Sequence, residues 1–364
     1  HSLWIDRIDV PEYALEFYKT LEEATDGDGD RDYLIEDKYF TENATREGSF
    51  SQIDFGNALT VCEIKCNSLD DMESKCVEAQ KATFAALAAF DRDHPEVFWL
   101  NNQSIVSNSY SYDRNTGAGT LSIYLLLKGS APIDNEVTSI DIRADAYGDA
   151  ASIKKDINLR DVRAKNIVDK IPSGADDVEM ITYFNDWLTR NNEYNTITAS
   201  GGAGYKEAHE CISALDGREG ENGPVCEGYA RAFKILCNQV DIPCVLVDGN
   251  ANGDPRQPHM WNYAQVDDAW YGVDVTWNDP PGGKGGKESG SENSDWLLLG
   301  ANTKVAEQGV TFLESHPVAN TVSTESPAFI NGPELALEKY MPYDCPNGKH
   351  KIKEIVVDER PATC

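Results

Sequence analysis

The chain has 364 residues, 40% of them hydrophobic, and its 62 acidic and 32 basic residues leave a net charge of −30. This length allows two or three domains with buried cores, and the absence of any run of eighteen apolar residues argues against a membrane span. A surface so acidic repels nucleic acids and anionic lipids, so we expect neither as a partner.

The cysteine content predicts an exported protein. The chain begins at His1 rather than methionine and carries nine cysteines, which leaves one thiol over if the others pair. We expect a secreted chain whose leader was removed, with a disulfide between Cys345 and Cys364. Further pairs are expected within two groups: Cys62, Cys66 and Cys76, and Cys211, Cys237 and Cys244. The sequons at Asn43 and Asn102 are compatible with a glycoprotein.

Helices and strands alternate in the first third of the chain. The apolar spacing predicts a helix over residues 11–23 and another that starts at Ser68, where Asp71 completes a capping box, and ends near Phe90. Strand-like segments follow at residues 97–100, 104–112 and 120–127, and turn residues at 115–117 join the last two into a hairpin.

An acidic segment lies between the two helices. Asp26, Asp28, Asp30 and Asp37 have the spacing of positions 1, 3, 5 and 12 in a calcium-binding loop. The sixth position is Arg31, where such a loop requires glycine, so a solvated acidic turn is the favoured interpretation. Calcium stays a weak candidate with a stabilising role, and the chemistry predicted below requires no metal or organic cofactor.

A third helix is predicted from Asp176, with apolar residues at three- and four-residue spacing up to Leu188. It leads into a polar segment that contains Tyr194 and Asn195. Residues 200–222 are rich in glycine and acidic residues, which indicates an irregular loop.

Cys226 stands where a loop gives way to a helix. Gly223 and Pro224 disfavour a helix interior, whereas Tyr229 begins an apolar pattern with helical spacing. The unpaired N–H groups and the positive end of the helix dipole at this start favour a thiolate. Cys226 is therefore a candidate nucleophile.

A base for this nucleophile is predicted in the next hairpin. Residues 258–266 and 269–277 are strand-like and flank Asp267 and Asp268. A two-residue turn makes His259 the diagonal neighbour of Asp274 on one face, whereas one extra turn residue would put them on opposite faces. In the first register Asp274 holds one ring nitrogen of His259 and the other nitrogen faces the thiol. Beyond it, residues 296–299 are expected to form a short buried strand.

Four short motifs carry a resemblance to a known family. They are Val-Cys-Glu-Gly-Tyr-Ala at 225–230, Ile-Pro at 242–243, His-Met-Trp-Asn at 259–262 and Trp-Tyr-Gly-Val-Asp-Val-Thr-Trp at 270–277. In this order they resemble the transglutaminase-like superfamily of papain-type cysteine enzymes, in its secreted microbial form. The resemblance implies that Cys226 is the nucleophile, His259 the general base and acid, and Asp274 the residue that orients the histidine.

The resemblance also implies a fold and a division of the chain. We expect an α+β fold in which the helix bearing the cysteine packs on an antiparallel sheet bearing the histidine and aspartate. The expected parts are an N-terminal α+β accessory region at 1–165, the catalytic core at 166–330 and a disulfide-pinned tail at 331–364. Tyr194, Asn195 and Trp261 are weak candidates for oxyanion or substrate binding. His316 resembles a histidine often seen near this point in the family, and we do not count it among the site residues.

The function implied is acyl transfer on protein or peptide amides through a thioester. Hydrolysis would make the chain a peptidase or deamidase, and attack by a lysine amine would make it a cross-linking transglutaminase. An amidase acting on glycosylated asparagine is a further alternative. From another class, an inactive binding or adhesion module predicts Cys226 buried or disulfide-bonded. The expected partner is an extracellular protein, peptide or cell-wall polymer.

Overall fold

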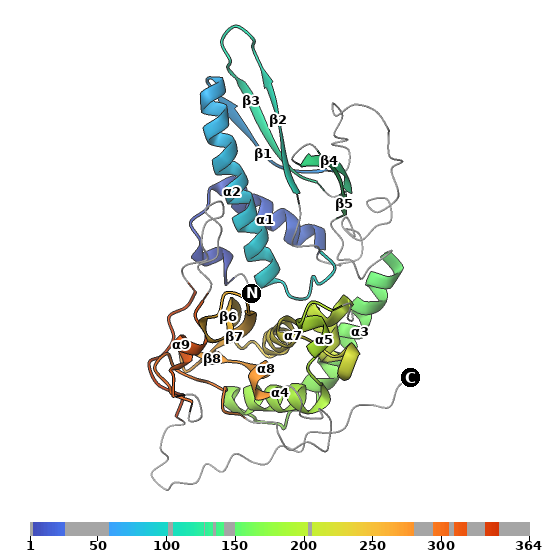
Figure 1. The fold of residues 1–364 in the computed structure, drawn as a ribbon, viewed down its shortest axis with the longest axis vertical. Helices are drawn as coiled ribbons and strands as arrows, with labels where there is room; N and C mark the ends of the chain where they lie inside the picture. The colour runs from blue at the N-terminus through green and yellow to red at the C-terminus, as the bar shows by residue number, and fades with distance from the viewer. Residues whose placement is uncertain are drawn as a thin grey trace. The chain divides into compact units, whose positions relative to one another are not determined.

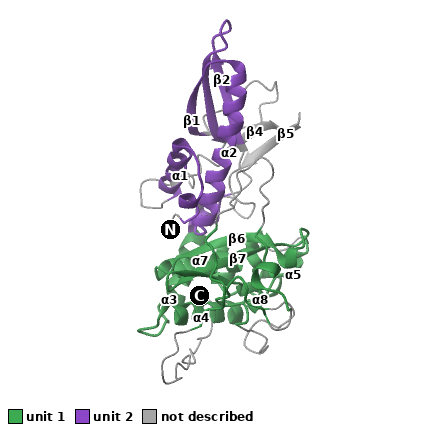
Figure 2. Ribbon diagram, turned by 90° about the vertical axis from the view of Figure 1, so that its left-hand side faces the viewer, with its two compact units in different colours: residues 1, 155–321, 331–364 green, residues 2–154, 322–330 purple. Residues whose placement is uncertain are grey.

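The computed structural model describes residues 3–25, 58–100, 105–126, 128–133, 136–141, 150–202, 206–279, 294–305, 309–318 and 332–341. It divides into two compact units (Figures 1 and 2). Unit 1 comprises residues 1, 155–321 and 331–364, and unit 2 comprises residues 2–154 and 322–330. No helix of the described residues is both long and apolar enough to cross a membrane.

Unit 2 combines helices with an antiparallel sheet. Its elements are α1 (Glu12–Thr25), β1 (Ala58–Cys66), α2 (Leu69–Asp93), β2 (Ile105–Tyr112), β3 (Gly119–Leu126), and a separate hairpin of β4 (Lys128–Ile133) and β5 (Glu136–Asp141). The three-stranded sheet has the order β1-β3-β2. Ser68 caps α2 by accepting from the Asp71 N–H, while the Asp71 carboxylate accepts from Asn67 instead of closing the predicted capping box.

The two predicted helices and the β2–β3 hairpin of unit 2 are confirmed, but the strand predicted at 97–100 is wrong. Phe98 and Trp99 are buried there in a turn, each 2% exposed. An apolar run therefore packed into the core without extended pairing. Strand β1 and the β4–β5 hairpin were not predicted.

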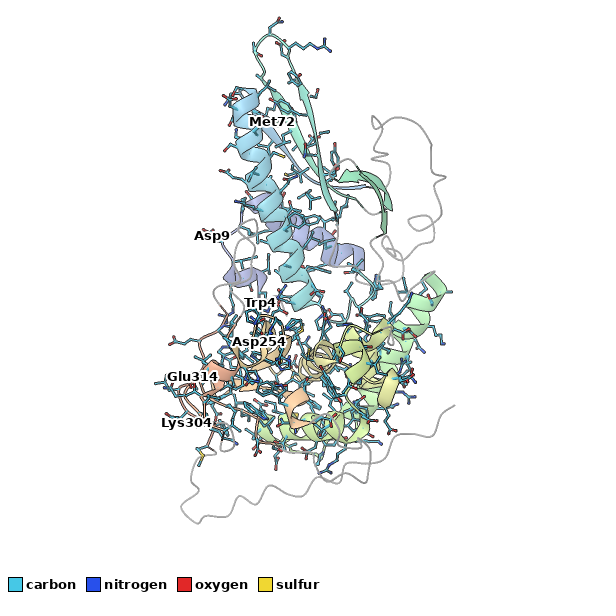
Figure 3. The ribbon with its side chains drawn as sticks, viewed as in Figure 1. Trp4, Asp9, Met72, Asp254, Lys304 and Glu314 are labelled. Carbon is cyan, nitrogen blue, oxygen red and sulfur yellow. The ribbon has the colours of Figure 1, made fainter. Side chains whose placement is uncertain are left out.

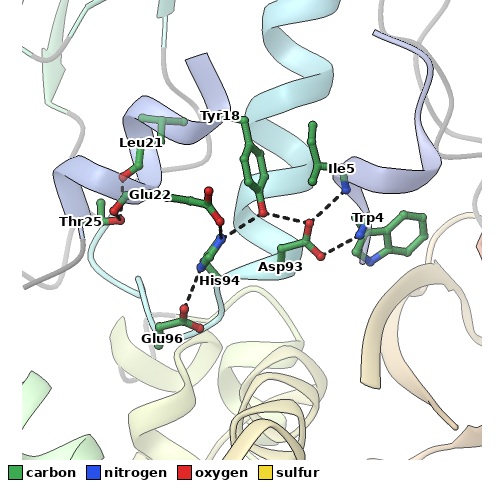
Figure 4. Close-up of polar contacts among 9 residues, drawn as sticks. All are labelled: Trp4, Ile5, Tyr18, Leu21, Glu22, Thr25, Asp93, His94 and Glu96. Carbon is green, nitrogen blue, oxygen red and sulfur yellow. Dashed lines mark hydrogen bonds and ion pairs between the residues drawn. The ribbon is translucent and has the colours of Figure 1, made fainter. Parts of the chain in front are cut away.

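Asp93 and His94, at the end of α2, form a polar cluster in unit 2 (Figure 4). The buried Asp93 carboxylate accepts from the backbone N–H groups of Trp4 (2.8 Å) and Ile5 (3.1 Å) and from the Tyr18 hydroxyl (3.1 Å). One carboxylate thus joins three segments that are distant in the sequence.

Unit 1 places helices against a second antiparallel sheet. Its helices are α3 (Ala150–Val168), α4 (Asp177–Asn191), α5 (Thr196–Ala199), α6 (Cys211–Leu215), α7 (Cys226–Gln239), α8 (Val275–Asn278) and α9 (Phe312–Ser315). The sheet has the order β6-β7-β8, formed by β6 (Cys244–Asn250), β7 (Pro258–Val266) and β8 (Ala269–Val273).

Helix α7 packs on this sheet through apolar and polar contacts. Phe233 and Leu236 are fully buried, and the Asn262 amide of β7 donates to the carbonyl of Ala230 at 3.0 Å. The buried Lys234 ammonium donates to the Cys244 carbonyl at the start of β6, at 2.8 Å. The α+β prediction is confirmed as a mixture of helices and antiparallel sheets, and α4, α7 and the β7–β8 hairpin lie where they were predicted.

Three expectations for unit 1 need correction. Residues 200–222 are not simply an irregular loop, because α6 lies within them with all five residues buried. The second hairpin strand ends at Val273, because Asp274 caps α8. Residues 296–299 are buried, but of them only Leu299 forms a bridge, to Gly272. Helix α3 was not predicted.

The expected disulfides within the two cysteine groups are absent from the described structure. None of the seven described cysteines forms a disulfide, namely Cys62, Cys66, Cys76, Cys211, Cys226, Cys237 and Cys244. Cys237 and Cys244 nevertheless lie close enough for their side chains to form a hydrogen bond.

Several predicted features lie outside the described residues. They are the calcium candidates Asp26, Asp28, Asp30 and Asp37, the sequons at Asn43 and Asn102, and the pair Cys345 and Cys364.

Candidate active site

Cys226 is the first residue of α7. Val225 precedes it in an extended conformation and offers no side-chain cap, so no side chain at that position takes up the free N–H groups of the first turn. The Cys226 side chain is free and only partly exposed. Its thiol lies at the positive end of a fourteen-residue helix.

The hairpin register brings the other two residues of the predicted triad together. Asp267 and Asp268 both have positive φ, at 49° and 62°, which gives a two-residue turn. Val266 then pairs with Ala269, and Asn262 pairs with Val273 at the far end of β8. This is the register that the sequence required for His259 and Asp274 to share a face.

Asp274 is held at both carboxylate oxygens. One oxygen, Oδ1, accepts from the backbone N–H of Trp277 at 3.0 Å, which caps α8. The other, Oδ2, lies 2.7 Å from Nε2 of His259. Burial opposes ionisation, but the His259 and His316 contacts outweigh it and hold the pKa of Asp274 well below its usual range.

His259 contacts both of its predicted partners. Nε2 of His259 faces Asp274, and the imidazole also forms a hydrogen bond with the Cys226 side chain. Nδ1 is the nitrogen that remains for this second hydrogen bond. Burial lowers the pKa of His259, but the charges and hydrogen bonds of Asp274 and Cys226 raise it to about 10. An imidazolium beside the sulfur is the arrangement that supports a thiolate.

Two tryptophans hold the imidazole in place. The rings of Trp261 and Trp277 stack on His259 with centroid separations of 5.9 Å and 5.4 Å. Trp261 is only 1% exposed, so its position suits orientation of His259 better than contact with a substrate.

The two weak candidates before α7 differ in their placement. The Tyr194 hydroxyl accepts a hydrogen bond from the backbone N–H of Cys226. Burial, followed by the charges of Cys226 and Asp274, raises the pKa of Tyr194, which keeps the phenol protonated. The buried Asn195 uses its amide within its own loop, accepting from the Thr198 N–H at 2.9 Å and donating to the Glu221 carbonyl at 2.8 Å.

His316 joins the site although the sequence analysis did not count it. It follows α9, the short helix that contains Glu314 (Figure 3), and is 0% exposed. Its Nε2 lies 2.9 Å from Asp274 Oδ2, the same oxygen that His259 contacts. The capping box of Thr311 and Glu314 is readable in the sequence, but it does not reveal what the end of α9 faces.

His259, Asp274 and His316 offer three ligand atoms within 4.8 Å of one another. The separations from Oδ2 to the two imidazole nitrogens are 2.7 Å and 2.9 Å. Tetrahedral zinc ligands at about 2.0–2.1 Å from the ion lie roughly 3.3 Å from one another. The shorter separations are those of direct hydrogen bonds, so we interpret the cluster as a hydrogen-bond network.

Comparison with known proteins places the site within a recognised family segment. Residues 165–275 match the model of the transglutaminase-like superfamily, and this segment contains Cys226, His259 and Asp274. No curated protein matches the chain.

Two solved structures are similar to parts of the chain. One, described as a crystal structure of a TGase, is 13% identical with a TM-score of 0.29, and the match covers 47% of this chain and 44% of that one. The other, a putative cysteine protease from Cytophaga hutchinsonii, is 16% identical with a TM-score of 0.26, covering 50% of this chain and 69% of that one. The match thus spans less than half the length of the first structure.

Proposed function

We propose that this chain is a cysteine-nucleophile acyl-transfer enzyme that acts on protein or peptide amides through a thioester at Cys226. The observation that carries the proposal is the position of the His259 ring, which bonds to Asp274 on one side and to the Cys226 side chain on the other. The match of residues 165–275 to the transglutaminase-like superfamily supports it.

The geometry suits two half-reactions. In the first, the Cys226 thiolate attacks the amide carbonyl carbon, the C–N bond breaks, and the His259 imidazolium gives its proton to the leaving amine. In the second, neutral His259 takes a proton from water or from an amine as that nucleophile attacks the thioester and releases the sulfur. Asp274 keeps the ring oriented and stabilises the imidazolium throughout.

Two donors suit the oxyanion that forms during attack. The backbone N–H of Cys226 lies at the helix start, close to where the charge develops. In this structure the Tyr194 hydroxyl accepts from that N–H, so an arriving oxyanion takes its place, and the hydroxyl retains its own proton because its pKa is raised. We propose Tyr194 as the second donor, whereas the engaged amide of Asn195 suits support of the loop.

An inactive binding or adhesion module is less well supported, because it requires Cys226 to be buried or disulfide-bonded. Cys226 instead forms no disulfide, is partly exposed and is hydrogen-bonded to His259. Peptidase, deamidase, cross-linking and glycosylated-asparagine amidase activities share the same triad chemistry. Secretion, an extracellular substrate and independence from metals are further parts of the proposal.

Cysteine labelling tests the proposal directly. At neutral pH, iodoacetamide should modify Cys226 faster than the buried thiols, and His259→Ala should slow that modification by at least about tenfold because the thiolate loses its counter-ion. The matched control is His209→Ala, which removes an imidazole of unit 1 that bonds to Glu227 at 3.0 Å. Equal labelling rates in the wild type and His259→Ala would refute the triad.

A second experiment identifies the acyl acceptor. Incubation with a glutamine-bearing peptide and a fluorescent amine should yield either the amine-linked peptide or the same peptide with its glutamine converted to glutamate, analysed by mass spectrometry. Incorporation of the amine with release of ammonia indicates cross-linking, and conversion of the residue to glutamate indicates deamidation.

A further inference from the structure

The Asp274 carboxylate has a donor besides His259. Its Oδ2 accepts from His259 and His316, while Oδ1 accepts from the Trp277 N–H. Each oxygen is therefore anchored even without His259. A buried carboxylate that must stay ionised and in one orientation requires donors of this kind.

Asp274 determines which nitrogen of His316 carries a proton. An ionised carboxylate only accepts hydrogen bonds, so Nε2 of His316, 2.9 Å from Asp274 Oδ2, carries the N–H. On the other side of the ring, the Ser315 hydroxyl lies 2.9 Å from Nδ1 and also 2.9 Å from the Phe312 carbonyl, to which it donates. In the neutral ring Nδ1 carries no proton, and it faces a hydroxyl that can rotate to donate to it.

The surroundings of His316 favour the neutral ring. Phe312 stacks on it at 4.4 Å, and Trp277 lies at 4.3 Å. The titratable groups that act on it are Asp274, after β8, and His259, on β7. Burial and the charge of His259 together lower the pKa of His316 by more than Asp274 and the Phe312 backbone raise it.

We propose that His316 is a positioning residue of the active site: as a neutral imidazole, it donates Nε2–H to Asp274 Oδ2 and holds that carboxylate ready for His259. This inference rests on the proposed function, because it assigns His316 a role in the same chemistry. The two histidines have different roles, because His259 exchanges its proton in each catalytic cycle whereas His316 does not change charge.

The physical benefit is a carboxylate whose state does not depend on His259. When His259 has given its proton to the leaving group, its positive charge no longer stabilises Asp274. The bonds from His316 and Trp277 remain and keep the carboxylate ionised and oriented until His259 is protonated again.

A pair of substitutions at His316 separates the effect of its hydrogen bond to Asp274 from the effect of its packing. His316→Gln retains an N–H near the position of Nε2, whereas His316→Met fills similar space without a donor. We expect His316→Met to slow the alkylation of Cys226 by about 10- to 100-fold, the effect of losing a hydrogen bond to a charged group. His316→Gln should recover most of that rate, and thermal unfolding of both variants verifies the fold.

NMR of the full chain with ¹⁵N-labelled histidine needs no substitution at 316. We expect the His316 ring to be neutral and protonated at Nε2 at neutral pH. An imidazolium or an Nδ1–H tautomer overturns the proposal, even where His316→Met fails to fold.

The failure of this inference differs from failure of the proposed function. If wild-type labelling depends on His259 but folded His316→Met labels like the wild type, or folded Gln and Met variants are equally slow, His316 does not act as a donor to Asp274. If labelling does not depend on His259 at all, the triad itself fails, and the role of His316 fails with it.

Discussion

Both units contain an aspartate and a histidine joined into a hydrogen-bond network, yet the two networks differ in what the histidine faces. In unit 2, Nδ1 of His94 lies 2.8 Å from Glu96, and Nε2 lies 3.0 Å from the Tyr18 hydroxyl and 3.1 Å from Glu22. Both nitrogens are thus occupied by oxygen groups. In unit 1, one nitrogen of His259 bonds to Asp274 and the ring also reaches the Cys226 side chain.

The difference shows that residue type alone does not decide what an aspartate–histidine network can do. The Asp93 carboxylate accepts hydrogen bonds from Trp4, Ile5 and Tyr18 and thereby joins separate parts of the chain. Asp274 directs one oxygen to two imidazoles, and one of these rings also contacts Cys226 at the start of α7. The first arrangement stabilises a fold, and the second can also ionise and move a proton.

Replacing each aspartate by asparagine should give the largest contrast. We expect Asp274→Asn to slow Cys226 alkylation by about 100-fold or more, because the amide cannot stabilise the imidazolium; the same change in the serine triad costs about 10⁴-fold in kcat. Asp93→Asn should leave that rate within about twofold while weakening unit 2. Iodoacetamide kinetics with thermal unfolding measure both, and similar rates for the two variants would contradict the distinction.

Raising the pH should destabilise unit 1 through His259. Its pKa is raised from 6.5 to about 10, so the imidazolium contributes fully below pH 6.5 and that contribution is lost as the pH rises toward 10. The pKa of Asp274 is lowered, so its contribution to the same pair is lost only in strong acid. Urea unfolding of unit 1 at pH 7 and pH 10 measures the loss. His259→Gln should be much less sensitive across this range, and a wild type equally stable at both pH values would exclude the ion pair.

Crowding the contact between β8 and α9 should have a smaller effect than the two changes above. A Cβ on Gly272 would lie 2.2 Å from the ring of Phe312, the first residue of α9. We expect Gly272→Ala to lower the free energy of unfolding by about 1–3 kcal/mol, as overpacking does. Because α9 leads to His316, Cys226 alkylation should slow as well. Gly174→Ala is the control for added bulk in the same unit, since nothing lies within 4 Å of its Cβ, although its positive φ adds strain of its own. Unchanged stability in Gly272→Ala would show that α9 is free to move away.

Removing a helix cap in each unit should have the smallest effect. Ser68 caps α2 and Asp176 caps α4, each by accepting from the third residue beyond it. We expect Ser68→Ala and Asp176→Ala each to cost about 1 kcal/mol of stability, measured by urea unfolding. Neither variant should change the labelling rate of Cys226, and a slower rate in one of them would extend the site to that helix.

Local sequence patterns predicted much of the site. A loop of glycine and proline before an apolar helical repeat placed Cys226 at a helix start, and Asp267-Asp268 between two strand-like runs set the hairpin register. These features depend on backbone preferences of a few adjacent residues, so they can be read without the fold.

The wrong predictions arose where tertiary packing overrides the local sequence pattern. The apolar run at 97–100 is buried in a turn, and α6 lies in a segment whose glycines and acidic residues indicated a loop. The cysteine groups suggested disulfides, but the described cysteines form none, and even the neighbouring Cys237 and Cys244 are thiols joined by a hydrogen bond.

The sequence by itself determined where the proposed nucleophile, its proposed base and the aspartate lie within their own elements. Only the tertiary structure decided that His316, 42 residues beyond Asp274, shares the oxygen of that carboxylate with His259. The reason is physical: spacing along a helix or hairpin constrains neighbours within one element, whereas the meeting of two separate elements depends on how their buried faces pack.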